Sequence, residues 1–247
     1  MDDVLLFAAI GFAAQLIDGA IGMAYGVTST TALLSFGVSP AVASASVHAA
    51  EMFTTGVSGA AHWRLGNVDA RIFRRLVIPG MIGGAVGAYV LSALPGDTIR
   101  PFVSAYLFVM GGVILYKAVR RVHVHQVPPN RFVPLGLVGA ALDAIGGGGW
   151  GPMVTSTMVS WGVPARMAVG TSNAVEFFVT TVISGTFLLT IGFELWSIIL
   201  GLVLGGCLAA PFAAYVTRRL PDKPLMILVG VTIMLLSLRD ILRAFTG

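Results

Sequence analysis

The chain has 247 residues, of which 56% are hydrophobic and 11% charged, and its mean hydropathy is +0.90. Soluble domains carry about 25% charged residues, so this composition excludes an ordinary soluble protein and indicates an integral membrane protein. The formal net charge of +4 does not indicate nucleic-acid binding, because the basic residues flank apolar segments, where membrane topology explains them.

The chain opens with two short apolar segments around a glycine-rich break. Val4–Ile17 follows two aspartates and no basic region, so we do not expect a cleaved signal peptide. As helices, Val4–Ile17 and Val27–Phe36 would be about 21 Å and about 15 Å long, and neither would cross about 30 Å of hydrocarbon alone. The pair predicts either one broken crossing or a re-entrant hairpin.

Six longer apolar segments are predicted to span the membrane as helices. They are Val38–Ala61, Leu76–Leu94, Phe102–Val119, Ala165–Ile191, Ile198–Val216 and Leu225–Leu238. The single cysteine, Cys207, excludes an intramolecular disulfide and a cysteine metal cluster. We expect neither a cofactor nor a bound metal.

The sequence contains an internal repeat. The segment Asp18–Val38 is matched 125 positions later by Asp143–Val163, and at the same offset Glu51 matches Glu176. Composition does not explain paired acids in a chain with only 11 of them. We therefore predict two homologous halves, residues 1–125 and 126–247, within one membrane domain.

The basic residues choose between the two topologies. If each opening pair is a hairpin, each half crosses three times, and 12 of the 15 basic residues lie on one side. A single broken crossing gives a weaker split of 10 to 5. Three crossings invert the second half relative to the first. The predicted fold is an all-α integral membrane protein with two inverted-topology repeats, each a glycine-rich re-entrant hairpin followed by three transmembrane helices. This organisation is typical of secondary transporters.

Two acid-containing pairs lie within predicted spans. His48 and Glu51 are three residues apart and share one helix face, and Asn173 and Glu176 are their counterparts. A charge at the bilayer centre costs about 2.5–3.5 kcal/mol, so such residues normally face water or a partner. We predict that Glu51 and Glu176 bind a coupling ion. The alternative is that both are protonated or hydrogen-bonded packing residues.

The glycine-rich breaks leave main-chain N–H groups at membrane depth, where helix N-termini favour an anion. Asp18 and Asp143 lie at these breaks, where they either bind the coupling ion or cap the hairpin turns. The predicted substrate-binding residues are Gly22, Gly26, Thr28, Thr30, His48, Gly147, Gly149, Trp150, Gly151, Thr155, Thr171, Ser172 and Asn173.

The segment Asp143–Phe178, with its "GGGGWGP" hairpin, Gly-Val-Pro break and Gly-Thr-Ser start of a span, resembles the TauE/SafE sulfite exporter family. Asp18–Phe53 is a fainter copy, and the loop Gly66–Arg71 and the span start Pro79–Val90 also fit. The resemblance covers nearly the whole chain. It implies transport of small sulfur-containing anions, such as sulfite or sulfoacetate, across the bacterial inner membrane.

The leading hypothesis is therefore a secondary active transporter that moves a small anion by alternating access, coupled to H⁺ or Na⁺. A passive anion channel is the main alternative. An intramembrane enzyme is disfavoured because the sequence has neither an H-E-x-x-H motif nor a serine nucleophile arrangement. The expected partners are the anion, the coupling ion and the lipid bilayer. The substrate, the transport direction and the oligomeric state, including a homodimer, stay open.

Overall fold

Long α-helices dominate the structure, a computed structural model that describes residues 2–21, 23–119, 129–192, 196–216 and 222–246. These ranges contain no strand. In lipid, each unpaired backbone N–H or C=O costs several kcal/mol, and a helix satisfies nearly all of them within its own segment. The predicted all-α class is confirmed.

Six helices in the described ranges have at least 21 residues, or about 31 Å, and correspond to the six predicted spans. They are α3 (Pro40–Arg64), α4 (Ala70–Ala93), α5 (Gly96–Val119), α8 (Ala165–Thr190), α9 (Trp196–Val216) and α10 (Asp222–Thr246). In α4, α5 and most of α8, that length is combined with mean hydropathies of 1.7, 1.8 and 1.3, so these three suit a membrane span by composition as well. The helix α3 is less apolar because a stripe of polar side chains runs along it.

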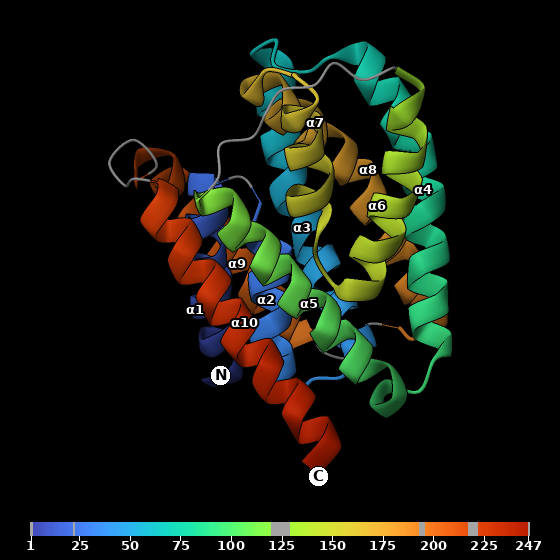
Figure 1. Cartoon of the computed structure of the whole chain (residues 1–247), viewed down its shortest axis with the longest axis vertical. Coiled ribbons are helices and arrows are strands. Elements are labelled where there is room, and N and C mark those ends of the chain that lie inside the picture. Colours follow the sequence, from blue (N-terminus) through green and yellow to red (C-terminus); the bar gives the residue numbers. More distant parts are fainter. Residues whose placement is uncertain (1, 22, 120–128, 193–195, 217–221, 247) are drawn as a thin grey trace.

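The first short pair of helices forms a hairpin. It consists of α1 (Asp2–Ile21) and α2 (Tyr25–Ser35). The helix α1 is about 30 Å long, longer than the predicted segment Val4–Ile17, because it continues through Asp18 to Ile21. In Figure 1 the chain ascends from the lower end in α1 and returns toward that end in α2. The two helices therefore run in opposite directions along the molecule.

The second hairpin opens toward the opposite end of the molecule. After a short 3₁₀ turn (Pro129–Arg131), α6 (Phe132–Gly146) descends to the middle, and a π-helical turn (Gly151–Thr155) and α7 (Ser156–Ser160) return upward (Figure 1). The turn depends on glycine, because α6 is capped in the left-handed conformation by Gly147, at φ +68°.

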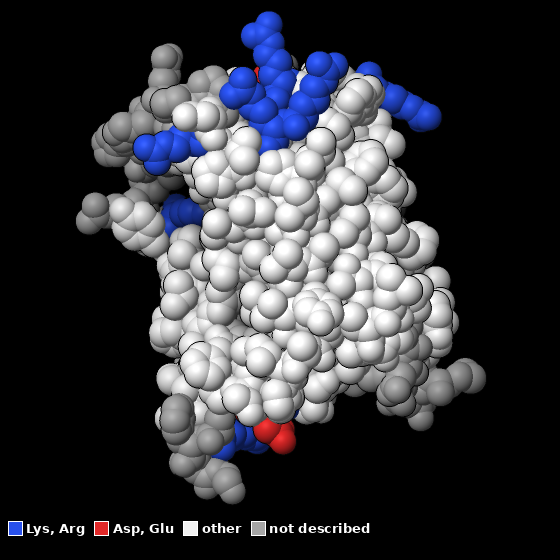
Figure 2. Space-filling view, turned by 90° about the vertical axis from the view of Figure 1, so that its right-hand side faces the viewer, with Lys and Arg blue, Asp and Glu red and all other residues white. Residues whose placement is uncertain are grey.

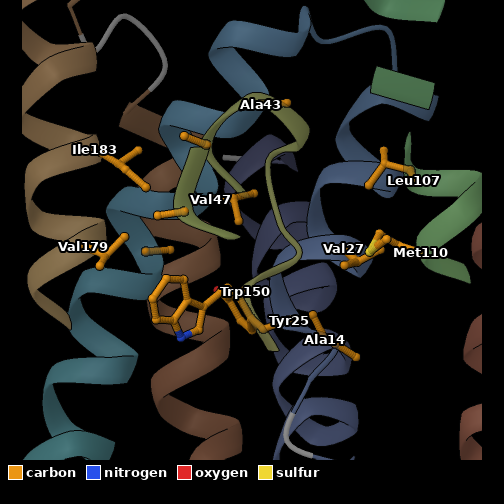
Figure 3. Packing of buried hydrophobic residues seen from close by; sticks show 14 of the residues in the cluster. Ala14, Tyr25, Val27, Ala43, Val47, Leu107, Met110, Trp150, Val179 and Ile183 are labelled. Carbon is orange, nitrogen blue, oxygen red and sulfur yellow. The ribbon is translucent and has the colours of Figure 1, made fainter. Parts of the chain in front are cut away.

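Helices from the two halves of the chain lie side by side: α1 with α9, α4 with α6, α3 with α8, and α5 with α10. Glycine allows main chains to meet at these seams. A Cβ atom at Gly11 would lie only 2.6 Å from the carbonyl oxygen of Leu202, and one at Gly136 only 2.9 Å from that of Leu76. The halves therefore interlock and share one core, in which Val47, Trp150 and Val179 are fully or almost fully buried (Figure 3).

Basic side chains gather at one end of the molecule, above a broad surface that is almost free of charged side chains (Figure 2). The exposed ones at that end, in described positions, are Arg64, Arg71, Arg74, Arg75, Arg131 and Lys223. The other end carries both chain termini (Figure 1). The asymmetry is the one from which the membrane orientation was predicted.

Candidate functional site

A small polar cavity lies where the tips of the two hairpins meet helices α3 and α8. Its volume, as space open to the centre of a water molecule, is about 30 Å³, enough for about two waters. The residues that line it are Asp18, Met23, Ala24, Tyr25, Gly26, Val27, Glu51, Thr54, Thr55, Gly149, Trp150, Gly151, Pro152, Asn173 and Glu176.

Both predicted glutamates line this cavity. Glu51 comes from the middle of α3 and Glu176 from the middle of α8, and these helices pack along their length. Glu51 is 5% exposed, and its Oε2 atom has no hydrogen-bond partner in the described part of the chain. The cavity lining includes Asp18 as a third carboxyl group but no Lys, Arg or His. The site is therefore rich in acidic groups and has no cation of its own.

The hairpin tips touch each other beside the glutamates. A Cβ atom at Gly26 would lie 2.8 Å from Glu51 Oε1 and 2.8 Å from Gly148 Cα. The Thr30 hydroxyl also donates a hydrogen bond to the carbonyl oxygen of Gly147, which ties the first hairpin to the second. Tight contact between two main chains explains why glycine occupies both tips.

The two aspartates cap the returning helices. The N–H groups of Ala24 and Tyr25 donate to Asp18 Oδ1 at 2.8 and 3.1 Å, and the N–H of Trp150 donates to Asp143 Oδ1 at 2.9 Å. These bonds satisfy N–H groups that we expected to face an anion. The geometry matches the capping alternative, and a coupling-ion role for either aspartate stays a prediction.

His48 lies behind the second hairpin and not in the cavity lining. Its Nε2 atom is 3.2 Å from Asp143 Oδ2, and its Nδ1 atom is 2.8 Å from the carbonyl oxygen of Ser44. Because a carbonyl only accepts, Nδ1 carries a proton, and the contact with the carboxylate needs a second proton on Nε2 or on Oδ2. This geometry gives His48 a bond to the hairpin and does not support the predicted contact with substrate.

The polar groups of several other predicted binding residues form hydrogen bonds within the protein. The indole N–H of Trp150 donates to Ser172 Oγ at 2.8 Å, and that oxygen is 2.5 Å from Thr155 Oγ1. Thr171 Oγ1 accepts from the N–H of Asp69 at 2.9 Å. The predicted residues outside the cavity lining are Thr28, Thr30, His48, Asp143, Gly147, Thr155, Thr171 and Ser172. Gly22 lies outside the described residues.

The predicted residues that the structure does bring together are Asp18, Gly26, Glu51, Gly149, Trp150, Gly151, Asn173 and Glu176. Asn173, the counterpart of His48, donates from Nδ2 to Ser58 Oγ at 2.8 Å. Helices α3 and α8 therefore each contribute a glutamate to the cavity. Only α8 also contributes the residue three positions before its glutamate, which is Asn173.

Two residues near the site were not predicted. Tyr25 lines the cavity opposite Trp150 (Figure 3), and the offset of 125 that pairs these two aromatic residues was the signal for it. Lys117, near the end of α5, donates to the carbonyl oxygen of Pro152 at 2.6 Å and to Ser156 Oγ. Its position at the end of an apolar segment suggested only a topological role, and the sequence carries no sign of its contact with the second hairpin.

No group of three or more His, Cys, Asp or Glu side chains is arranged to hold a metal ion in the described ranges. The chemistry that the site offers is therefore main-chain and side-chain hydrogen bonding around carboxyl groups. Such a site can exchange protons or a small cation with a passing solute, and it has no activated nucleophile beside a base.

Comparison with known proteins gives two matches. The model of the family described as sulfite exporter TauE/SafE matches residues 7–239. The chain is also 44% identical, over 254 residues, to the probable membrane transporter protein YtnM of Bacillus subtilis (strain 168), and the match covers 98% of this chain and 84% of that protein. No solved structure matches. Both descriptions are of membrane transport proteins.

Proposed function

Because the chain belongs to the TauE/SafE sulfite exporter family, we propose that it carries a small sulfur-containing anion, such as sulfite or sulfoacetate, across the bacterial inner membrane. Transport takes place by alternating access and is coupled to H⁺ or Na⁺. The observation that carries this proposal is the single cavity shared by two hairpin tips and two midspan glutamates.

The arrangement of helices supports inverted repeats as the basis of the mechanism. The hairpins open toward opposite ends (Figure 1), and each pairing of helices has its counterpart: α1 with α9 corresponds to α6 with α4. The pairs α3–α8 and α5–α10 each join a helix to its own copy. Two equivalent halves around one site can expose that site first to one side and then to the other.

The size of the cavity favours a carrier over an open pore. A volume of about 30 Å³ holds about two waters, so a sulfonate enters only after the surrounding helices or hairpins move. Hydrogen bonds from Thr30 and Lys117 hold the second hairpin in this closed arrangement. We propose that contacts between this hairpin and its neighbours break when the site opens.

The carboxyl groups supply the coupling. An anion next to two ionised glutamates would be repelled, and a buried charge without a partner is strongly disfavoured. Binding of the anion therefore requires that a proton or Na⁺ accompany it at Glu51, Glu176 or both. The coupling ion compensates for the missing lysine or arginine in the cavity lining.

The test compares uphill transport with equilibrium exchange in proteoliposomes loaded with labelled sulfite or sulfoacetate. Glu51→Gln and Glu176→Gln mimic the protonated state, so each variant should retain exchange but lose accumulation driven by an ion gradient. Asp97→Asn, at an exposed acid outside the cavity, is the matched control and should behave like the wild type.

Wild-type accumulation and pH dependence in both glutamine variants would show that the glutamates only pack between helices. Flux that rises linearly with substrate and never exceeds equilibrium, in the wild type, would instead identify a channel. A parallel screen with sulfate, taurine and small carboxylates defines the substrate class.

A further inference from the structure

A second, apolar hollow lies on the other side of the α3–α8 pair. This groove has a volume of about 510 Å³, within the range of about 300–1,000 Å³ that small-molecule sites occupy. It lies in the half of the molecule nearer the basic end, and the indole N–H of Trp63 is the one polar group among the side chains that line it. The groove is lined by Gly56, Gly59, Ala60, Trp63, Phe73, Ala174, Phe177 and Phe178.

Small residues form the floor of the groove and aromatic residues form its walls. A Cβ atom at Gly59 would lie 2.9 Å from Ala174 Cα, so α3 and α8 meet there without a side chain between them. The rings of Trp63 and Phe73 are 5.6 Å apart and nearly perpendicular, and those of Phe73 and Phe178 are 5.8 Å apart. Such edge-to-face contacts hold the walls in place.

The basic end of the molecule begins where the groove ends. Arg64 follows Trp63 at the end of α3, and Arg74 follows Phe73 in the second turn of α4. Arg71 and Arg75 are also exposed in the first two turns of α4, and Lys and Arg side chains gather at one end of the molecule in Figure 2. None of these four guanidinium groups forms an ion pair within the described ranges.

We propose that the groove binds one acyl chain of an anionic phospholipid whose phosphate lies against Arg64 and Arg74, the residues that follow Trp63 and Phe73. The apolar lining suits the chain, and the aromatic walls next to a helix end suit the boundary between hydrocarbon and headgroups. Guanidinium groups bind phosphate well, often with two parallel hydrogen bonds. A zwitterionic lipid fills the same groove but leaves the positive charge uncompensated.

A second copy of the chain fits this surface less well. A stable protein interface takes about 20–30 residues from each side, whereas eight residues line the groove. A symmetric partner would also bring a second set of the same arginines to the rim. The groove is therefore a lipid site in size and in charge.

The groove and the polar cavity lie on opposite faces of the same two helices, α3 and α8. Thr55, Asn173 and Glu176 line the polar cavity from the same two helices whose other faces form the groove. A lipid chain lodged there packs against the seam between α3 and α8. Anionic lipid thus stabilises the contact between the two helices that carry the glutamates.

The experiment uses tryptophan quenching by lipids with brominated acyl chains. Purified protein is placed in phosphatidylcholine vesicles that contain a fixed fraction of brominated phosphatidylglycerol or of brominated phosphatidylcholine. The difference between wild type and Trp63→Phe isolates the signal of Trp63. We expect stronger quenching by the phosphatidylglycerol, and each of Arg64→Gln and Arg74→Gln should weaken that preference by about fivefold.

Two controls separate the groove from general attraction to the membrane. Lys223→Gln removes an exposed basic residue from the same end on the far side of the molecule and should leave the preference unchanged. Ala60→Leu fills the groove from an exposed position and should remove the preference while the thermal unfolding temperature is kept. Equal quenching by both lipids, or an unchanged preference in Ala60→Leu, would overturn the proposal. A dimer with an unquenched Trp63 would assign the groove to a second copy instead.

Discussion

The contact between the hairpin tips offers a sharp test of the site, because Gly148 lies against the main chain of Gly26. Gly148 has φ +148°, in a region that essentially only glycine occupies, and a Cβ atom there would overlap the carbonyl carbon of Gly26. In Gly148→Ala, the strained backbone costs about 1–3 kcal/mol, and the overlap costs about 1–3 kcal/mol more. Only the overlap with Gly26 is relieved if the two tips move apart.

We therefore expect Gly148→Ala to disfavour the arrangement in which the tips close the cavity. Even the lower value for the overlap, about 1 kcal/mol, reduces the population of that arrangement by about fivefold. Exchange of labelled sulfite or sulfoacetate should fall by a similar factor, while the six long helices keep the protein folded in the membrane. Gly185→Ala, on α8, is the control, because a Cβ atom there meets nothing within 4 Å.

The assay combines exchange in proteoliposomes with thermal unfolding of the purified protein. If Gly148→Ala exchanges substrate at the wild-type rate, contact between the tips is not part of the transport cycle. If its unfolding temperature collapses together with transport, the glycine serves packing alone.

Two further predictions concern orientation and the second hairpin. The first uses a Cys207→Ser background and a membrane-impermeant thiol reagent applied to intact cells. The reagent should label Leu94→Cys and not Leu65→Cys, because Leu65 lies at the basic end, which we predict to be cytoplasmic. The reverse labelling pattern would invert the topology. Lys117→Met should slow exchange because it removes two hydrogen bonds, each worth about 1.5–3 kcal/mol. Lys117→Arg should recover part of the rate. Equal rates in both variants would exclude a role for the ammonium group.

The outline of the fold was readable from the sequence because it depends on composition and periodicity. Continuous apolar segments give helices of spanning length, and glycine runs break them where the chain must turn. Glu51 and Glu176 converge because α3 packs against its own copy, α8, which brings their matched positions to the same cavity. The length of α1 was not predictable, because Asp18 and Gly19 hide the continuation of the helix to Ile21.

The partners of individual polar groups were beyond the sequence. Thr30 and Ser172 have the same hydroxyl chemistry as a binding residue, but Thr30 bonds to Gly147 and Ser172 accepts from Trp150. Which role a hydroxyl takes depends on the position of a segment more than a hundred residues away, or on the rotation of a neighbouring ring. Lys117 is a similar case, because only the packed hairpin supplies its acceptors.

The two halves match in sequence but not in proton chemistry. His48 Nε2 lies 3.2 Å from Asp143 Oδ2, and this contact joins the second hairpin to α3 behind the cavity. Asp18, the counterpart of Asp143, lines the cavity. The counterpart of His48 is Asn173 on α8, whose amide is bonded to Ser58 and cannot take up or release a proton. The second hairpin is therefore tied to α3 by a buried side-chain contact that has no counterpart among the described contacts of Asp18 and Asn173. Since the two hairpins are otherwise matched in sequence, this contact is a feature by which they differ, and Asp18 is the aspartate that lines the cavity.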